Sequence, residues 1–114
     1  MHTCAIKYPY ASFYILGVFD GAMSYLNPIS KSEAGLQALQ ELDQAIRKYH
    51  PEWNKDEIYL RGFDLGDAID DLIIKPKIIS EYEKFRLMKK VLRRTGHHYS
   101  LIKYTHMIGK MFKP

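Results

Sequence analysis

The sequence predicts an all-α protein: a compact single domain of four or five helices spanning residues 1–114. Ser or Asn followed three residues later by Glu, the signature of a helix N-cap, precedes three separate segments. Each of those segments carries apolar residues at spacings of three and four, the helical period. The chain is 46% apolar and 26% charged, and its 114 residues suffice for one core but not two. No internal repeat is apparent beyond the three similar caps.

Residues 10–26 are strongly apolar and admit two interpretations. They form either a buried helix that ends before Asn27-Pro28, or a β-hairpin in which residues 12–19 and 22–26 flank Asp20-Gly21, a dipeptide suited to a tight reversal. The helix is preferred because the rest of the chain is helical and an isolated two-stranded hairpin is marginal in water. Asp20 argues against a membrane span, since a carboxylate there costs about 2.5 to 3.5 kcal/mol on insertion.

A helix is predicted to start near residue 31, where Ser30 and Glu33 match the cap signature, and to end at His50-Pro51. Asp43 precedes Arg47 by one turn, which predicts an exposed ion pair that stabilises the helix by about 0.3 kcal/mol. The residues predicted to face the core are Leu36, Leu39, Leu42, Ile46 and Tyr49.

The next helix is predicted to start near residue 55, capped by Asn54 with Glu57, and to end at Lys75-Pro76. Gly62 and Gly66 are expected to weaken it by about 1 kcal/mol each relative to alanine. Leu65, Ala68, Ile69 and Leu72 form its apolar face, and Asp64, Asp67 and Asp71 lie opposite.

A third helix is predicted to start near residue 81, capped by Ser80 with Glu83, and to stop at Gly96 in a left-handed conformation. Its predicted inward residues are Ile78, Tyr82, Phe85, Leu87, Met88, Val91 and Leu92. The final segment, residues 97–112, is predicted to continue as a helix or to form a strand. In the helix, the inward side chains would be Leu101, Tyr104, Ile108 and Met111 or Phe112.

Charge is distributed very unevenly along the chain. Residues 75–114 hold eleven Lys or Arg against two Glu, a formal charge of +9, whereas residues 1–74 hold six against eleven acidic residues, a charge of −5. Such asymmetry is typical of a protein with a charged partner, or of one whose copies associate into a homodimer.

Six Lys or Arg between residues 84 and 100 make this stretch the candidate binding site. Three explanations stay open: a solvated surface neutralised by Asp64, Asp67, Asp70 and Asp71, contact with nucleic-acid phosphates, or contact with an acidic protein surface. In a helix-turn-helix arrangement with its turn at Gly96, residues 97–99 and Lys103 would lie on an exposed recognition surface, but Leu92 and Thr105 fit that motif poorly. The candidate residues are Arg86, Lys89, Lys90, Arg93, Arg94, His97, His98 and Lys103.

No pattern in the sequence indicates catalysis, a metal or a cofactor. Asp67, Asp70 and Asp71 lack a second acidic cluster, since Glu41 and Asp43 form no recognisable pattern with them. His97, His98 and His106 include no pair at i, i+4, and Cys4 with His2 would need two further ligands. Nucleophile-elbow and glycine-rich phosphate-loop motifs are missing as well.

The sequence therefore predicts a small non-catalytic regulatory protein that docks its basic C-terminal helical face on a nucleic acid or a nucleoprotein complex. Cys4, the single cysteine, suits a reducing compartment, so a cytoplasmic location is expected. The alternative is a protein-binding inhibitor or adaptor, for example one carried by a phage or mobile element that blocks a host complex by protein–protein contact.

Overall fold

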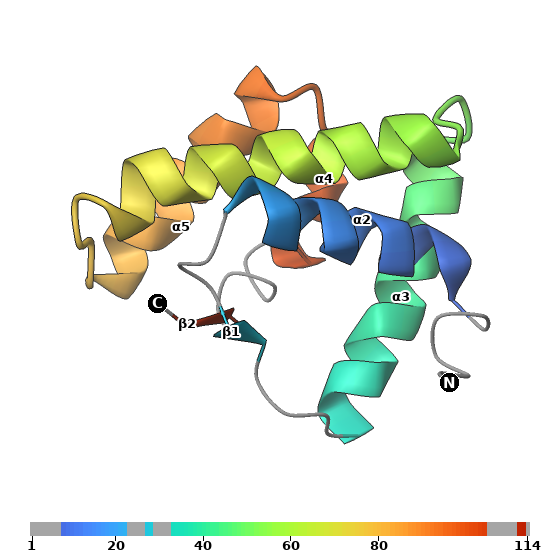
Figure 1. Cartoon of the computed structure of the whole chain (residues 1–114), viewed down its shortest axis with the longest axis horizontal. Coiled ribbons are helices and arrows are strands. Elements are labelled where there is room, and N and C mark those ends of the chain that lie inside the picture. The colour runs from blue at the N-terminus through green and yellow to red at the C-terminus, as the bar shows by residue number, and fades with distance from the viewer. Residues whose placement is uncertain (1–7, 23–26, 29–32, 105–111, 114) are drawn as a thin grey trace.

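The computed structural model describes residues 8–22, 27–28, 33–104 and 112–113, and it has the predicted all-α architecture (Figure 1). The principal helices are α2 (Pro9–Gly21), α3 (Glu33–Tyr49), α4 (Lys55–Ile69) and α5 (Glu81–Arg94). A π-helical turn, η2 (Asp70–Ile74), extends α4, and a 3₁₀ turn, η3 (Tyr99–Leu101), follows α5. Two short antiparallel strands, β1 (Asn27–Pro28) and β2 (Phe112–Lys113), pair Asn27 with Lys113 and Pro28 with Phe112.

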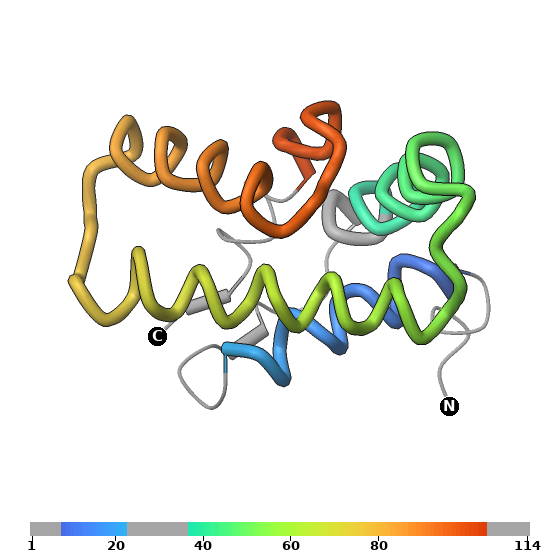
Figure 2. Tube along the Cα trace, turned by 90° about the horizontal axis from the view of Figure 1, so that it is seen from above, coloured from blue at the N-terminus to red at the C-terminus, as the bar shows by residue number. Residues whose placement is uncertain are grey.

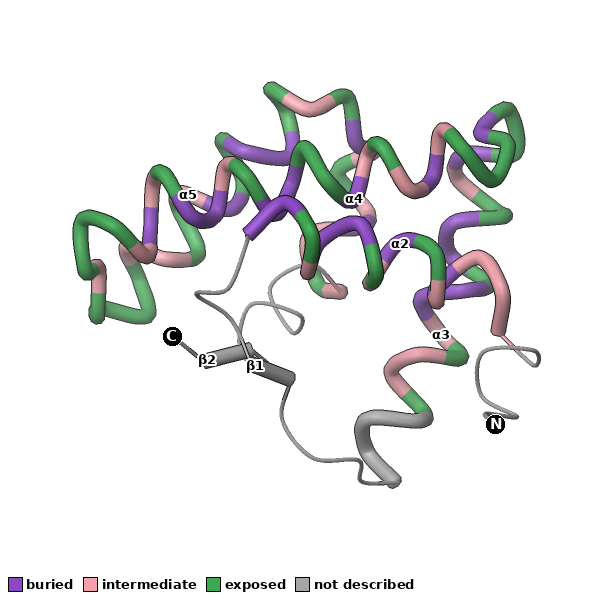
Figure 3. The backbone as a smooth tube through the Cα atoms, in the orientation of Figure 1, coloured by how far each residue is buried: buried purple, intermediate pink, exposed green. Residues whose placement is uncertain are grey.

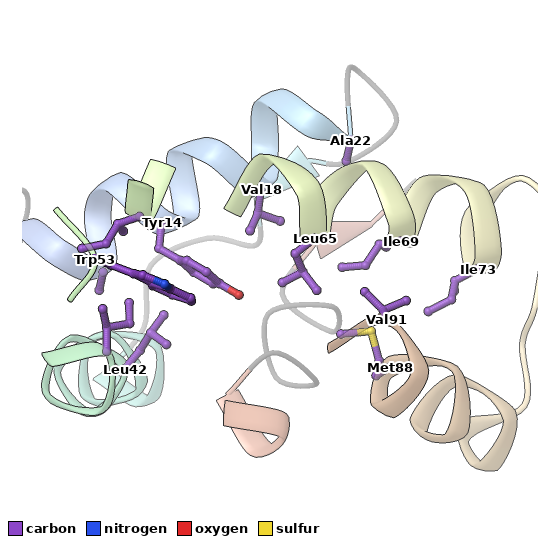
Figure 4. Close-up of a cluster of buried hydrophobic side chains, with 13 residues drawn as sticks. Tyr14, Val18, Ala22, Leu42, Trp53, Leu65, Ile69, Ile73, Met88 and Val91 are labelled. Carbon is purple, nitrogen blue, oxygen red and sulfur yellow. The ribbon is translucent and has the colours of Figure 1, made fainter. Parts of the chain in front are cut away.

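Helix α4 is the central element. Helix α2 lies along one side of it and runs in the same direction, while α5 returns along the other side in the opposite direction (Figure 2). Helix α3 crosses steeply and packs against α2 (Figure 1). Buried residues lie where these helices meet (Figure 3), and their side chains point into the surfaces between the helices (Figure 4). They are Ala11, Tyr14, Val18, Ala22, Leu42, Ile46, Trp53, Ile58, Leu65, Ile69, Ile73, Met88 and Val91.

The helical interpretation of the N-terminal apolar segment is confirmed over Pro9–Gly21. A hairpin would need residues 12–19 as a strand, and these residues are helical; most of its second strand, along with Cys4 and His106, lies outside the described residues. Among those described residues, no helix has both the length and the apolar character needed to cross a bilayer.

Two of the three predicted N-caps are confirmed. The Asn54 side chain accepts from the Glu57 N–H at 2.8 Å, and the Ser80 hydroxyl accepts from the Glu83 N–H at 3.3 Å. The side chain of Glu57 binds Arg61, one turn further along, at 2.8 Å. The third cap, at Ser30, lies outside the described residues. Helix ends before His50-Pro51 and at Gly96, whose φ is +76°, also agree with the prediction.

Helices α2 and α4 touch through their backbones along a seam of four glycines, Gly17 and Gly21 on α2 and Gly62 and Gly66 on α4. A Cβ atom built on Gly17 would overlap the carbonyl oxygen of Tyr59, and one on Gly62 would overlap that of Tyr14. Gly21 and Gly66 meet the carbonyls of Phe63 and Val18 in the same way. The pattern Tyr-x-x-Gly-x-x-x-Gly occurs in both helices, starting at residues 14 and 59, so a repeat does exist.

These glycines correct the expectation that they only weaken α4. Small residues four apart let two helix axes approach until Cα–H groups contact carbonyl oxygens on the neighbouring helix. The intrinsic cost of Gly62 and Gly66, about 1 kcal/mol each, is offset by close packing that any side chain would prevent. We call this contact the glycine seam.

Asp43 of α3 caps the first turn of α2. Its Oδ1 accepts from the backbone N–H groups of Tyr10 and Ala11 at 2.9 and 3.0 Å, whereas Tyr8, at the N-cap position of α2, provides no side-chain cap. Asp43 is buried, so the predicted exposed pair with Arg47 is wrong; the Arg47 guanidinium lies over the Tyr10 ring instead. A carboxylate at a helix N-terminus also complements the helix dipole.

Asp43→Ala is expected to lower the free energy of unfolding by about 2 kcal/mol, because two largely buried N–H groups lose a charged acceptor. Asp43→Asn keeps an oxygen in place and should lose about half as much. Urea unfolding followed by far-UV circular dichroism measures both, with the exposed neighbour Gln44→Ala as control. Equal stability of Asp43→Ala and Gln44→Ala would contradict the capping role.

Candidate nucleic-acid interface

The basic face of α5 is exposed as predicted. Met88, Val91 and Leu92 are buried against the rest of the protein, which turns the opposite side of the helix to solvent (Figure 3). At 100° per residue, the outward cations fall within an arc of about 140°. We call this set the cation row; it consists of Arg86, Lys89, Lys90, Arg93 and Arg94, all exposed.

The carboxylates of α4 and η2 leave this row uncompensated. Asp70 and Asp71 pair with Lys75, whose Nζ lies 3.7 and 3.2 Å from their carboxylate oxygens. Arg86 pairs with Glu83 on its own helix. Among the described residues, no ion pair joins a carboxylate to the other four cations of the row, which are Lys89, Lys90, Arg93 and Arg94. Four of its five charges are therefore available to a polyanion.

The three remaining candidate residues do not continue this face. His97 is only 8% exposed, which corrects the expectation that it lies on a recognition surface. His98 is half-buried, with Nδ1 accepting from the Ser100 N–H at 3.0 Å. Lys103 is exposed, but its Nζ lies 3.8 Å from a carboxylate oxygen of Glu41 on α3. The cation row itself is what remains of the candidate site.

Two aromatic residues predicted to face the core lie beside the cation row instead. Tyr82 is 76% exposed and Phe85 is 41% exposed, and the Nζ of Lys89 sits 5.7 Å from the centre of the Phe85 ring. Both belong to the first half of α5, which lies at the edge of the molecule (Figure 1). Helical periodicity therefore gave the correct face of α5 but overestimated how far the core extends along it.

A buried polar cluster that the sequence does not reveal joins four segments of the chain. The Tyr14 hydroxyl and His97 Nε2 are 2.7 Å apart, and His97 Nδ1 is 2.7 Å from Thr95 Oγ1. Because the Thr95 hydroxyl donates to the Val91 carbonyl at 2.8 Å, its oxygen must accept from Nδ1–H. Nε2 is then the acceptor of the Tyr14 O–H.

His50 and Trp53 complete this cluster. Their rings are stacked with ring centres 3.6 Å apart, and His50 Nε2 accepts a hydrogen bond from the His98 N–H at 2.8 Å. Arg61 lies over the Trp53 ring and donates to the Thr95 carbonyl at 2.8 Å. The residues come from α2, the α3–α4 connection, α4 and the turn after α5. Neither periodicity nor short motifs connect positions so far apart, so only the structure shows them together.

Burial keeps the imidazole of His97 neutral. Desolvation, followed by the nearby His50 and more weakly Arg61, lowers its pKa to about 3, although a hydrogen bond with the Thr95 backbone acts in the opposite direction. Burial likewise raises the pKa of the Tyr14 phenol well above 10.0. The hydrogen bonds of His97 and His50 occupy both nitrogens of each ring, which identifies the cluster as a structural one that fixes the turn after α5.

No group of three or more His, Cys, Asp or Glu side chains within the described segments has the geometry of a metal site. Asp70 is the one buried carboxylate of the acidic segment Asp67–Asp71, and its Oδ1 has no hydrogen-bond partner among the residues that the structure describes. Its Oδ2 lies 3.7 Å from Lys75, while Asp67 and Asp71 are exposed.

Comparison with known proteins adds no further constraint: no family model matches the chain, and neither a curated protein nor a solved structure matches it significantly.

Proposed function

We propose that this protein is a non-catalytic intracellular binding protein that docks the cation row of α5 on a nucleic acid or a nucleoprotein complex. The observation that carries the proposal is that four of the five exposed cations on one helical face have no carboxylate partner among the described residues. A salt-bridged cation would lose its carboxylate partner on binding, whereas these four have no such partner to lose within the described part of the chain. The single Cys4 fits the reducing environment of the cytoplasm.

Binding of this kind depends on the release of counterions. Each phosphate neutralised by Lys or Arg releases condensed cations, so the logarithm of the affinity falls linearly with the logarithm of the salt concentration. Contacts from the four available cations predict a slope of about −2.8 for a single strand and about −3.6 for a duplex. Binding should therefore weaken by orders of magnitude as salt rises, and the slope counts the phosphates in contact.

The double variant Lys90→Glu/Arg93→Glu is expected to lower the affinity for nucleic acid by about tenfold or more. It should also reduce the magnitude of the slope of log affinity against log salt concentration by about 2. The matched control is Arg47→Glu/Lys55→Glu, which reverses two exposed cations on α3 and α4 and also changes the formal net charge from +4 to 0. Fluorescence anisotropy with labelled oligonucleotides at several salt concentrations measures both quantities. Equal losses in the two variants would show that net charge, and not the cation row, determines binding.

A second candidate function is protein binding through the surface of the α2–α4 pair. Four large apolar side chains are exposed there: Phe13, Leu16, Leu60 and Phe63. The two helices share this surface, because Lys55 of α4 lies over the Phe13 ring and Tyr59 donates to Asp20 of α2 at 2.6 Å. Exposed apolar patches of this kind are typical of protein–protein contact sites.

Affinity capture from a cell lysate, with and without nuclease treatment, separates the two candidates. A stoichiometric protein partner that remains after nuclease treatment, and that binds with weak salt dependence, would favour the α2–α4 surface over the cation row. Association of two copies through the oppositely charged halves of the chain stays a prediction, and a doubled mass that dissociates in high salt would support it.

A further inference from the structure

Exposed aromatic rings lie at both ends of the cation row. Tyr82 and Phe85 belong to the first half of α5, and Tyr99, which is 79% exposed, follows the last turn of the same helix in η3. Isolated exposed aromatics are common on protein surfaces. Rings placed along a row of exposed cations are different, because they provide flat faces at the place where a polyanion is expected to bind.

Tyr99 ends a stack of three rings. Tyr49 of α3 stacks on His98 with ring centres 4.6 Å apart and planes 19° apart, and His98 stacks on Tyr99 at 4.5 Å and 25°. The bond from the Ser100 N–H to His98 Nδ1 holds the middle ring in place. One face of Tyr99 is covered by His98 while most of the residue remains exposed, so its other face is open to solvent.

The stack is anchored next to the cation row. The turn η3 packs against both α5 and α3, and the bonds of His97 to Tyr14 and Thr95 fix the chain between Gly96 and η3. Arg93 and Arg94 occupy the last turn of α5, directly before that chain. Tyr99 is thus held beside the C-terminal end of the row on a rigid support, which reduces the entropy lost when a flat ligand stacks on it.

We infer that the ligand of the cation row is a single-stranded nucleic acid, and that Tyr99 is a platform on which one of its bases stacks. This inference rests on the proposed function and names its substrate class. A duplex presents phosphates but keeps its base faces stacked inside, whereas a single strand offers both. Cations four residues apart, such as Arg86 and Lys90, are spaced by about 6 Å along the helix axis, of the order of the phosphate spacing in an extended strand.

Phe85 and Tyr82 provide a second aromatic site at the other end of the row. Lys89 lies over the Phe85 ring, so charge and aromatic surface are adjacent there as well. Proteins that bind single strands without sequence preference combine a cationic track with aromatic rings in this way. The arrangement predicts tolerance of base sequence, because every base has a face that stacks.

The test compares labelled single strands, oligo(dT) and oligo(U) of about 15 nucleotides, with a duplex of the same length at about 50 mM salt. The single strands are expected to bind more tightly than the duplex. Tyr99→Leu should lower the affinity for them by about 5- to 150-fold and leave the salt slope unchanged, because no charge is altered. Tyr99→Phe keeps the ring and should bind like the native protein.

The matched control is Phe13→Leu, which removes an exposed ring from α2, on the far side of α4 from α5 (Figure 2). It should bind like the native protein. The single-strand inference would be overturned if the protein bound the duplex more tightly, or if a folded Tyr99→Leu bound single strands as the native protein does. In either case the proposed function would still stand if Lys90→Glu/Arg93→Glu binds nucleic acid weakly. A native protein that binds none of these nucleic acids would overturn both.

Discussion

Replacing Gly62 with alanine is expected to lower the free energy of unfolding by about 3 kcal/mol, although alanine is the better helix former by about 1 kcal/mol. The new Cβ would overlap the Tyr14 carbonyl oxygen, which belongs to the backbone and cannot move without shifting α2. Gly17→Ala places its Cβ on the Tyr59 carbonyl and should behave similarly. Urea unfolding followed by circular dichroism measures these losses.

The control for the glycine seam is Asp64→Ala, an exposed position two residues after Gly62 on the same helix. It introduces the same side chain and should leave the stability unchanged or slightly higher, in line with helix propensity. If Gly62→Ala also matched the native protein, α2 and α4 would have to lie further apart than the structure places them.

Lowering the pH from 7 to 5 is expected to reduce the free energy of unfolding by about 2 kcal/mol through His97 alone. In the folded protein the His97 pKa is about 3, whereas the ordinary value is 6.5. Between these values the unfolded chain binds a proton that the folded protein does not. This contribution to stability is therefore complete above pH 6.5 and is lost as the pH falls from 6.5 towards 3.

The pH effect is assigned by comparing the native protein with His97→Gln in urea titrations at pH 7, 6 and 5. Glutamine can still accept the Tyr14 O–H but does not titrate, so the variant should lose less stability on acidification. Tyr99→Phe, which alters a nearby exposed ring and no imidazole, should retain the native pH dependence. Equal slopes for native protein and His97→Gln, or a His97 ring signal that titrates near pH 6 by NMR, would contradict the assignment.

Local rules explain which parts of this fold are predictable. The caps at Asn54 and Ser80 and the helix ends before Pro51 and at Gly96 depend on neighbours within a few residues, so they could be predicted from sequence. The outward face of α5 follows from helical period alone. These elements were enough to predict the cation row.

The remaining features depend on contacts between distant segments. Gly62 has a poor intrinsic helix propensity. Its contribution to packing becomes visible only when the carbonyl of Tyr14, 48 residues earlier, is placed against it. Asp43 resembles a surface carboxylate until the first turn of α2 is placed next to it. Tyr99 lies in a segment of ambiguous periodicity, and its importance depends on the stack that begins at Tyr49. The doubled Tyr-x-x-Gly-x-x-x-Gly pattern is the one signal in the sequence that points to such a contact.

The glycine seam also suggests how distant relatives of this chain would differ from it. A contact between main-chain atoms cannot be restored by a compensating change in a neighbouring side chain, unlike ordinary core packing. Substitutions should therefore accumulate on α3 and on the solvent side of α5 while the four glycines persist. Two small residues four apart, and a second such pair 45 positions downstream, would then be a more durable mark of common ancestry than any charged or aromatic residue on the surface.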